Sequence, residues 1–158
     1  MITESEFFIR ILLAAGLGGV IGFEREWSHK VAGLRTHALV AIGAALLSII
    51  SISAFPKGAT TIGYDPSRII SNIIVGIGFI GGGAILRQGL RVQGITTAAT
   101  LWVVAAIGIA IGVGFISEAL FTTGVVYFVL TVLWFLEKKL AKFRKEDGHE
   151  NNENGTSE

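Results

Sequence analysis

Five long apolar stretches, separated by short polar segments, constrain this chain more than any other feature of its sequence. Each stretch is close to the roughly 20 residues that a helix needs to cross the hydrocarbon core of a bilayer. Only 16% of the residues are charged, whereas a soluble domain carries roughly 25%. We therefore predict an all-α integral membrane protein, a compact five-helix transmembrane bundle with short loops and a charged cytoplasmic tail. The predicted spans are Phe7–Phe23, Ala38–Phe55, Ile69–Leu86, Thr96–Gly114 and Ala119–Leu136.

The bundle is predicted to occupy residues 1–136, and the tail residues 137–158. The first part of the tail, Glu137–Lys145, is expected to continue the fifth helix as a charged extension. The remainder, Asp147–Glu158, is rich in Asn, Glu, Gly and Ser and is expected to be disordered. We interpret the first apolar stretch as a retained helix, because acidic rather than basic residues precede it and no small-residue cleavage site follows it.

Lys and Arg residues are distributed unevenly between the two sides of the predicted bundle. Ten of the thirteen lie after the first span, after the third span or in the tail, and three lie toward the other side. Cytoplasmic loops of membrane proteins carry an excess of these residues. We therefore predict a multi-pass protein with its N-terminus outside and its C-terminus in the cytoplasm.

The residues and motifs that most enzymes and metal sites require are missing from the sequence. The chain has no cysteine, which excludes disulfide scaffolds, thiolate metal sites and cysteine nucleophiles. It contains no Walker-type loop, HExxH or GxSxG motif, and its polar segments are too short to form a catalytic domain. No basic stripe for a nucleic acid precedes the tail. We expect a non-enzymatic protein with no catalytic residue, no metal site, no cofactor and no nucleic-acid partner.

Glycine is the second unusual feature, since nineteen of the twenty-one glycines lie between Gly16 and Gly124. Lipid is as apolar as leucine, so membrane helices associate through close packing, which small residues at four-residue spacing permit. We expect such rows to bring helix backbones unusually close together. The rows are Ala14, Gly18 and Gly22 in the first span, Gly78 and Gly82 in the third, and Gly108 and Gly112 in the fourth.

The segment Gly76–Gly83 holds five glycines in eight residues. Each glycine costs roughly 1 kcal/mol relative to alanine in a helix interior, so this segment is a weak helix. One interpretation, which we favour, is extreme crowding of the third span against the first and fourth. The alternative is a break or π-bulge that exposes carbonyl groups toward a cavity, as in the discontinuous helices of transporters.

Few polar side chains lie within the spans, and no Asp or Glu lies deep in any of them. A path for a divalent cation would ordinarily present carboxylates near the midplane or at its mouth. Asn72 is the main amide inside a span, and it is expected either to bond to a neighbouring helix or to contact a ligand or partner. Thr96 and Thr97 begin the fourth span, where such hydroxyl groups usually bond to carbonyls of their own helix.

The cytoplasmic rim of the bundle is richer in charge. Its excess of bases mildly favours anionic lipid or an acidic partner, and its histidines are interpreted as solvated loop residues. We predict that at least one of Glu24 and Glu26 forms a salt bridge with Arg35, Arg87 or Arg91. The candidate functional or partner-binding residues are Glu24, Arg25, Glu26, Arg35, Asn72, Gly78, Gly82, Arg87, Thr96 and Thr97.

Three ordered motifs resemble those of the MgtC/SapB family of inner-membrane proteins. The first comprises Gly22–Glu26 and Ala32–His37, the second is Gly76–Gly83, and the third begins with Gly94–Trp102. Together they cover roughly residues 10 to 115, so the resemblance is to the membrane core. The founding branch of the family also carries a soluble ACT-like C-terminal domain, whereas this sequence is expected to have only a charged tail after the core.

The resemblance implies a bacterial-type inner-membrane protein that is linked to growth under low Mg²⁺ and, in pathogens, to virulence. The founding member of the family is thought to restrain the proton-translocating ATP synthase rather than to pump Mg²⁺. We therefore expect a regulator of membrane energetics or ion homeostasis that lies in the lipid bilayer, forms a homo-oligomer and acts through a membrane protein partner. The alternatives are a small solute or ion transporter acting as a homo-oligomer, and a structural subunit with no activity of its own.

Overall fold

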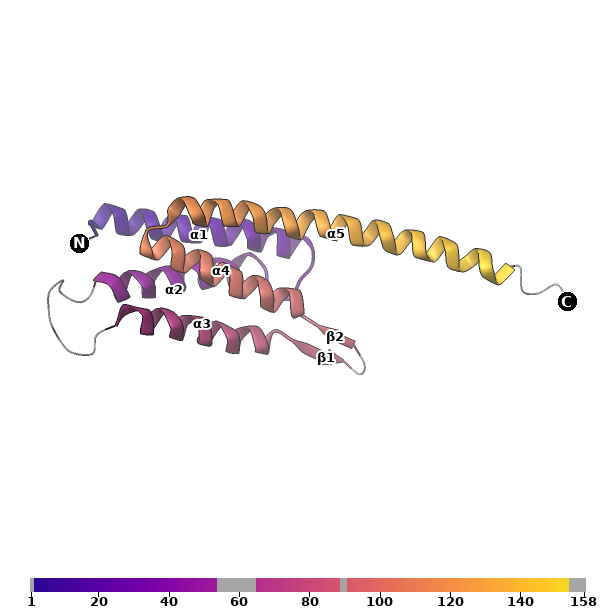
Figure 1. The fold of residues 1–158 in the computed structure, drawn as a ribbon, viewed down its shortest axis with the longest axis horizontal. Coiled ribbons are helices and arrows are strands. Elements are labelled where there is room, and N and C mark those ends of the chain that lie inside the picture. The colour runs from indigo at the N-terminus through magenta and orange to yellow at the C-terminus, as the bar shows by residue number, and fades with distance from the viewer. Residues whose placement is uncertain (1, 54–64, 89–90, 154–158) are drawn as a thin grey trace.

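The computed structural model describes residues 2–53, 65–88 and 91–153. Five helices run alternately up and down the long axis, so the two termini lie at opposite ends (Figure 1). A two-stranded hairpin joins the third helix to the fourth. The elements are α1 (Glu4–Trp27), α2 (Leu34–Ser53), α3 (Pro66–Gly83), β1 (Leu86–Gln88), β2 (Arg91–Gln93), α4 (Ile95–Val113) and α5 (Ile116–Glu153).

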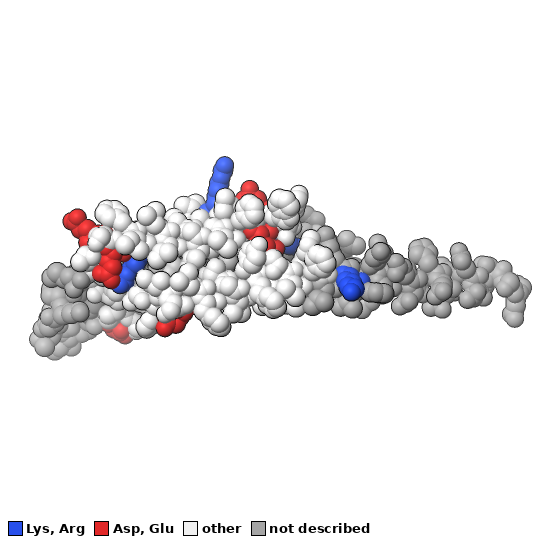
Figure 2. Space-filling model, turned by 90° about the horizontal axis from the view of Figure 1, so that it is seen from above, with Lys and Arg blue, Asp and Glu red and all other residues white. Residues whose placement is uncertain are grey.

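The predicted all-α membrane bundle is confirmed. Four helices are long and apolar enough to cross a membrane, namely α1, α2, α4 and the Ile116–Phe135 part of α5. Helix α3, which has 18 residues and contains Arg68, Asn72 and the glycine run, is not among these four, but it lies along α2 and α4 in the same bundle (Figure 1). Uncharged residues make up most of the face seen in Figure 2. Such a surface suits a lipid environment.

The helix ends follow local signals. Thr3 caps α1 in a capping box with Glu6, in which each side chain accepts a hydrogen bond from the other residue's backbone N–H. Asp65 caps α3 by accepting a hydrogen bond of 2.9 Å from Ser67 N, and Pro66 takes the first helical position. These caps extend both helices beyond the predicted apolar stretches. The predicted end of the second span, Phe55, lies outside the described residues.

Helices α1, α2 and α4 pack around two of the predicted small-residue rows. A Cβ atom added to Gly18 would lie 2.7 Å from Ala41 Cβ, and one added to Gly112 would lie 2.6 Å from Ala45 O. Gly22 and Gly108 meet the backbone of α2 at similarly short range. The rows in the first and fourth spans therefore bring backbones into contact, as predicted.

The third row behaves differently. Nothing lies within 4 Å of a Cβ added to Gly78 or Gly82, so the predicted crowding of the glycine run is wrong. The predicted alternative of a break is also wrong, because α3 is a continuous helix. The buried stripe of α3 is Ile73, Ile77 and Gly81, whereas Gly78 and Gly82 each lie about 100° further round the helix. The two glycines form part of an open face.

The hairpin between α3 and α4 was not predicted, because the third apolar stretch was extended to Leu86. Strands β1 and β2 are antiparallel, with Leu86 opposite Gln93 and Gln88 opposite Arg91. Gly94 follows β2 with a φ of +92°, and a Cβ at this position would collide with the carbonyl group of Ala84. Glycine therefore makes the turn from the hairpin into α4 possible.

Helix α5 continues well past its apolar part, which ends at Phe135. It runs through Glu137–Lys145, as predicted, and on to Glu153. The helix thus includes the beginning of the segment that we expected to be disordered. Glu and Lys, which favour helices, fill much of this extension and account for its continuation.

Candidate functional site

A buried ion pair lies where α1 ends, at the end of the bundle that holds the 28–33 loop and the hairpin. We call this the hairpin end (Figure 1). Arg25 is 2% exposed and Glu24 is 6% exposed. Arg25 Nε donates a hydrogen bond to the Glu24 carboxylate, and Ser28 Oγ donates a second one, of 2.8 Å, to its other oxygen. A buried charge of this kind is tolerated only when it is paired and hydrogen-bonded.

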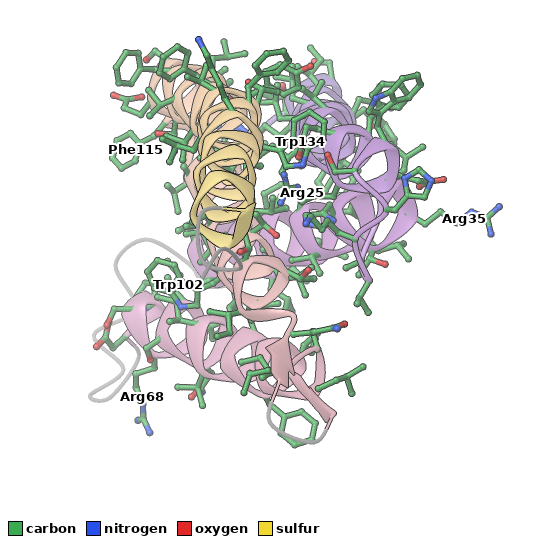
Figure 3. All side chains as sticks on the ribbon, turned by 90° about the vertical axis from the view of Figure 1, so that its right-hand side faces the viewer. Arg25, Arg35, Arg68, Trp102, Phe115 and Trp134 are labelled. Carbon is green, nitrogen blue, oxygen red and sulfur yellow. The ribbon has the colours of Figure 1, made fainter. Side chains whose placement is uncertain are left out.

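The predicted salt bridge with Arg35 is wrong. Arg35 is exposed and points away from the bundle, whereas Arg25 points into it (Figure 3). Glu24 is paired with its own neighbour in the sequence because the buried stripe of α1 reaches both residues as the helix ends. Arg87 lies in β1 and Arg91 in β2, and their side chains lie outside the part of the structure that is described.

Glu26 has a different partner. Its carboxylate accepts a hydrogen bond of 2.9 Å from the backbone N–H of Leu34, the first residue of α2. A Cβ added to Gly33 would lie 2.7 Å from Glu26 Oε2, so glycine at this position lets the carboxylate approach. An acid at a helix N-terminus satisfies a free N–H group and interacts favourably with the helix dipole. Glu26 therefore fixes the start of α2 to the end of α1.

His37 is fully buried, which contradicts its interpretation as a solvated loop residue. Its Nδ1 donates to Gly33 O at 2.9 Å, because a carbonyl oxygen can only accept, and its Nε2 lies 3.2 Å from Thr100 Oγ1. The Thr100 hydroxyl lies 2.9 Å from Thr97 O. Its single hydrogen can be donated either to Thr97 O or to His37 Nε2. This chain of polar groups joins the 28–33 loop, α2 and α4.

The spacing of residues in the sequence is consistent with a buried histidine at this position. His37 lies four residues before Ala41 and eight before Ala45, and all three belong to one buried stripe of α2. Thr100 likewise follows Thr97 by three residues on the buried side of α4. Thr96, the other predicted threonine, is exposed.

Arg10 is a buried base at the opposite end of the bundle, and it was not among the predicted site residues. Its Nη1 donates to Gly112 O at 2.7 Å, and its Nη2 forms a 2.9 Å salt bridge with Glu6. A cation near a helix C-terminus interacts favourably with the helix dipole. Gly114 ends α4 in the left-handed conformation beside this guanidinium group. Through its hydrogen bond to Gly112 O, Arg10 therefore links α1 to the C-terminal end of α4.

Asn72 lines an apolar groove of about 640 Å³ between α2 and α3. Gly43 and Gly76 also line it, and nothing lies within 4 Å of a Cβ added to either glycine. The Asn72 amide is exposed and has no hydrogen-bond partner among the described residues. A groove that combines small residues with an amide unpaired in the described part of the chain is suited to another helix.

The structure thus divides the ten predicted residues among different places. Glu24, Arg25, Glu26 and Thr97 come together at the hairpin end, where Ser28, His37 and Thr100 join them. Asn72 lines the groove between α2 and α3, and Gly78 and Gly82 lie on the open face of α3. Arg35 and Thr96 are exposed, and Arg87 lies in β1. In the described part of the chain, no three His, Asp or Glu residues come close enough together to hold a metal ion.

Comparison with known proteins identifies relatives of this chain. Residues 11–139 match the MgtC family. The chain is 43% identical over 138 residues to "Putative magnesium transporter YhiD" of Escherichia coli K12, which is 86% of this chain and 64% of that protein. It is 44% identical over 117 residues to "Protein MgtC" of Salmonella typhimurium LT2, which is 74% of this chain and 48% of that protein.

A third relative is "Uncharacterized protein slr0014" of Synechocystis sp., 48% identical over 115 residues, which is 73% of this chain and 47% of that protein. The chain therefore spans about half to two thirds of the length of the curated relatives that it matches. No solved structure matches it.

Proposed function

This chain belongs to the MgtC family of membrane proteins, and from this we propose that it is a non-enzymatic regulator of membrane energetics or ion homeostasis under magnesium limitation. In this proposal it lies in a bacterial inner membrane with its C-terminus in the cytoplasm, and it acts by binding a membrane protein. The proton-translocating ATP synthase is the first partner to test. Of its relatives, one is named MgtC and another is named as a putative magnesium transporter.

The observation that carries this proposal is the open groove between α2 and α3. Asn72 presents there an amide that has no partner in the described ranges of the chain, and Gly43 and Gly76 leave space for a close approach. An amide that has no partner in the membrane favours association with a second helix by about 0.6–2 kcal/mol. A transmembrane helix of the partner that carries an amide or hydroxyl group would satisfy Asn72.

The charge distribution supports regulation over cation transport. Glu24 is the one acid that the bundle buries among the described residues, and it lies at the hairpin end, paired with Arg25. A path for a divalent cation would need several carboxylates near the midplane or at its mouth. The hydrogen bonds of the polar cluster at the hairpin end instead join α1, α2 and α4 to one another.

A transporter that acts as a homo-oligomer is the second candidate. The Escherichia coli relative, which shares 43% identity over 86% of this chain, is named as a putative magnesium transporter, and this name favours the second candidate. In such an assembly the open glycine faces of α3 from several copies would line the path.

One groove variant with a matched control, combined with a flux measurement, separates the two functions. Gly76→Leu fills the groove, and Gly124→Leu adds the same side chain at an equally open position on α5. We expect wild-type protein and the Gly124 variant to restore growth of a deletion strain at low Mg²⁺ and to co-purify with a partner, and the Gly76 variant to do neither. Mg²⁺ flux into proteoliposomes that contain the purified protein alone would contradict regulation and support transport.

A further inference from the structure

A separate pocket of about 370 Å³ opens between the end of α1 and the end of the apolar part of α5. Its volume lies within the roughly 300–1,000 Å³ that is typical of small-molecule sites. Five aromatic residues and one carboxylate dominate its lining. They are Phe23, Glu24 and Trp27 of α1, and Tyr127, Trp134 and Phe135 of α5.

The pocket lies at the depth of the membrane–water interface. Trp27 is the last residue of α1, and Phe135 is the last residue of the apolar part of α5. After Leu136 the sequence continues with Glu137 and two Lys residues. Trp and Tyr side chains concentrate at this depth because one part of the ring system is apolar and the other is polar. The natural occupant of a pocket there is a lipid headgroup.

The lining favours a cation. Aromatic faces attract ammonium groups that come within about 6 Å of the ring centre. Glu24 accepts hydrogen bonds from Arg25 and Ser28, but a carboxylate can accept about four, so its oxygens retain capacity for another donor. Thr131, which also lines the pocket, donates its hydroxyl hydrogen to Tyr127 O at 2.8 Å and so offers its oxygen as an acceptor.

The rim of the pocket offers donors instead. The Trp27 indole N–H has no hydrogen-bond partner among the described residues, and Trp27 ends α1. Lys139 is exposed and follows Phe135 by one helical turn. These groups are suited to the oxygens of a phosphate that lies just outside the ammonium group. The pocket thus combines acceptors inside with donors outside.

We propose that this interfacial pocket binds the headgroup of phosphatidylethanolamine, with its ammonium group between the aromatic rings and near Glu24. An ammonium group carries N–H donors for the carboxylate, which the quaternary amine of phosphatidylcholine lacks. Phosphatidylglycerol has no cation at all. Binding of this lipid does not depend on the regulatory function proposed above, because neither the groove between α2 and α3 nor a protein partner forms part of the pocket.

The test is binding of short-chain lipids to the purified protein in detergent. We expect phosphatidylethanolamine to bind more tightly than phosphatidylcholine, and phosphatidylcholine more tightly than phosphatidylglycerol. Trp27→Leu should weaken binding of phosphatidylethanolamine about two- to fivefold, the fold-change that corresponds to an exposed cation–π contact. Trp102→Leu is the matched control, because Trp102 is also exposed but lies on α4 outside the pocket.

Trp27 is 75% exposed, so its replacement leaves the core intact. Trp27→Phe gives a second test, since it keeps an aromatic ring and removes the indole N–H donor at the rim, and it should weaken binding of all three phospholipids. Two results would overturn the proposal. One is equal or tighter binding of phosphatidylglycerol. The other is the same affinity for phosphatidylethanolamine in the Trp27 and Trp102 variants.

Discussion

Replacing Gly112 by alanine should destabilise the protein, whereas the same replacement at Gly82 should not. Both glycines belong to helices and to four-residue rows of small residues. The Cβ added at Gly112 would lie 2.6 Å from both Ala45 O and Ser48 Cβ, but nothing lies within 4 Å of the one added at Gly82. Comparison of the two variants therefore separates the cost of crowding a close helix contact from the gain of replacing glycine by alanine in a helix.

The magnitude follows from two opposing terms. Carbon atoms pack at about 3.5–4.0 Å, so α2 and α4 would have to separate by about 1 Å at Gly112. Overpacking of this kind costs about 1–3 kcal/mol, and the upper part of the range applies because the obstacle includes backbone atoms. Alanine gains about 1 kcal/mol over glycine in either helix. We expect a net loss of about 2 kcal/mol for Gly112→Ala and a gain of up to about 1 kcal/mol for Gly82→Ala.

Unfolding of the purified variants in mixed detergent micelles, followed by far-ultraviolet circular dichroism as the fraction of denaturing detergent rises, measures this difference. The wild-type protein should unfold between the two variants. Equal unfolding midpoints for Gly112→Ala and Gly82→Ala would refute the assignment of close packing to the α2–α4 contact and of an open face to α3.

Three further predictions concern the ion pair, the cap of α3 and the topology. Arg25→Gln should cost about 3–5 kcal/mol because it leaves a buried carboxylate unpaired, and adding Glu24→Gln should recover much of this loss in the same unfolding assay; additive losses would contradict the pairing. Hydrogen bonds from Ser67 lower the pKa of Asp65 from its ordinary value. The ionised cap should therefore stabilise α3 fully when the pH is above the ordinary pKa, and this stabilisation should be lost as the pH falls through the lowered pKa. Titration by NMR should show Ser67→Ala raising the pKa of Asp65, because the variant loses the hydroxyl donor and keeps the backbone N–H, and an unchanged pKa would exclude the bond from the hydroxyl group. Reporter domains fused at the N-terminus and after Lys145 should report opposite sides of the membrane, and a result on one side would exclude an odd number of spans.

The sequence predicted the helices well because the length of an apolar stretch is a local property. Each of the five predicted spans overlaps a helix of the structure. The rows that contain Gly18 and Gly112 were also predicted correctly, since spacing along a helix places small residues on one face. Local capping at Asp65 could be recognised in the same way. Family membership followed from motifs that need no knowledge of the fold.

The candidate site was harder to predict. Glu24 and Arg25 were selected as candidates, but their pairing with each other was not predicted, because the orientation of two adjacent side chains depends on the helices packed around them. His37 was placed in solvent because it precedes the second apolar stretch. In the structure α2 begins earlier, at Leu34, and carries the histidine into its buried stripe.

The class of protein, the number of helices and the small-residue faces of α1 and α4 could all be predicted from local sequence patterns. The packing of the helices against one another determines which face of α3 is buried, which group pairs with Glu24 and where His37 lies. The physical reason is that lipid and neighbouring helices are equally apolar. Hydrophobicity therefore marks a segment as membrane-embedded but does not distinguish the face that meets Ala98 from the face that carries Gly78 and Gly82.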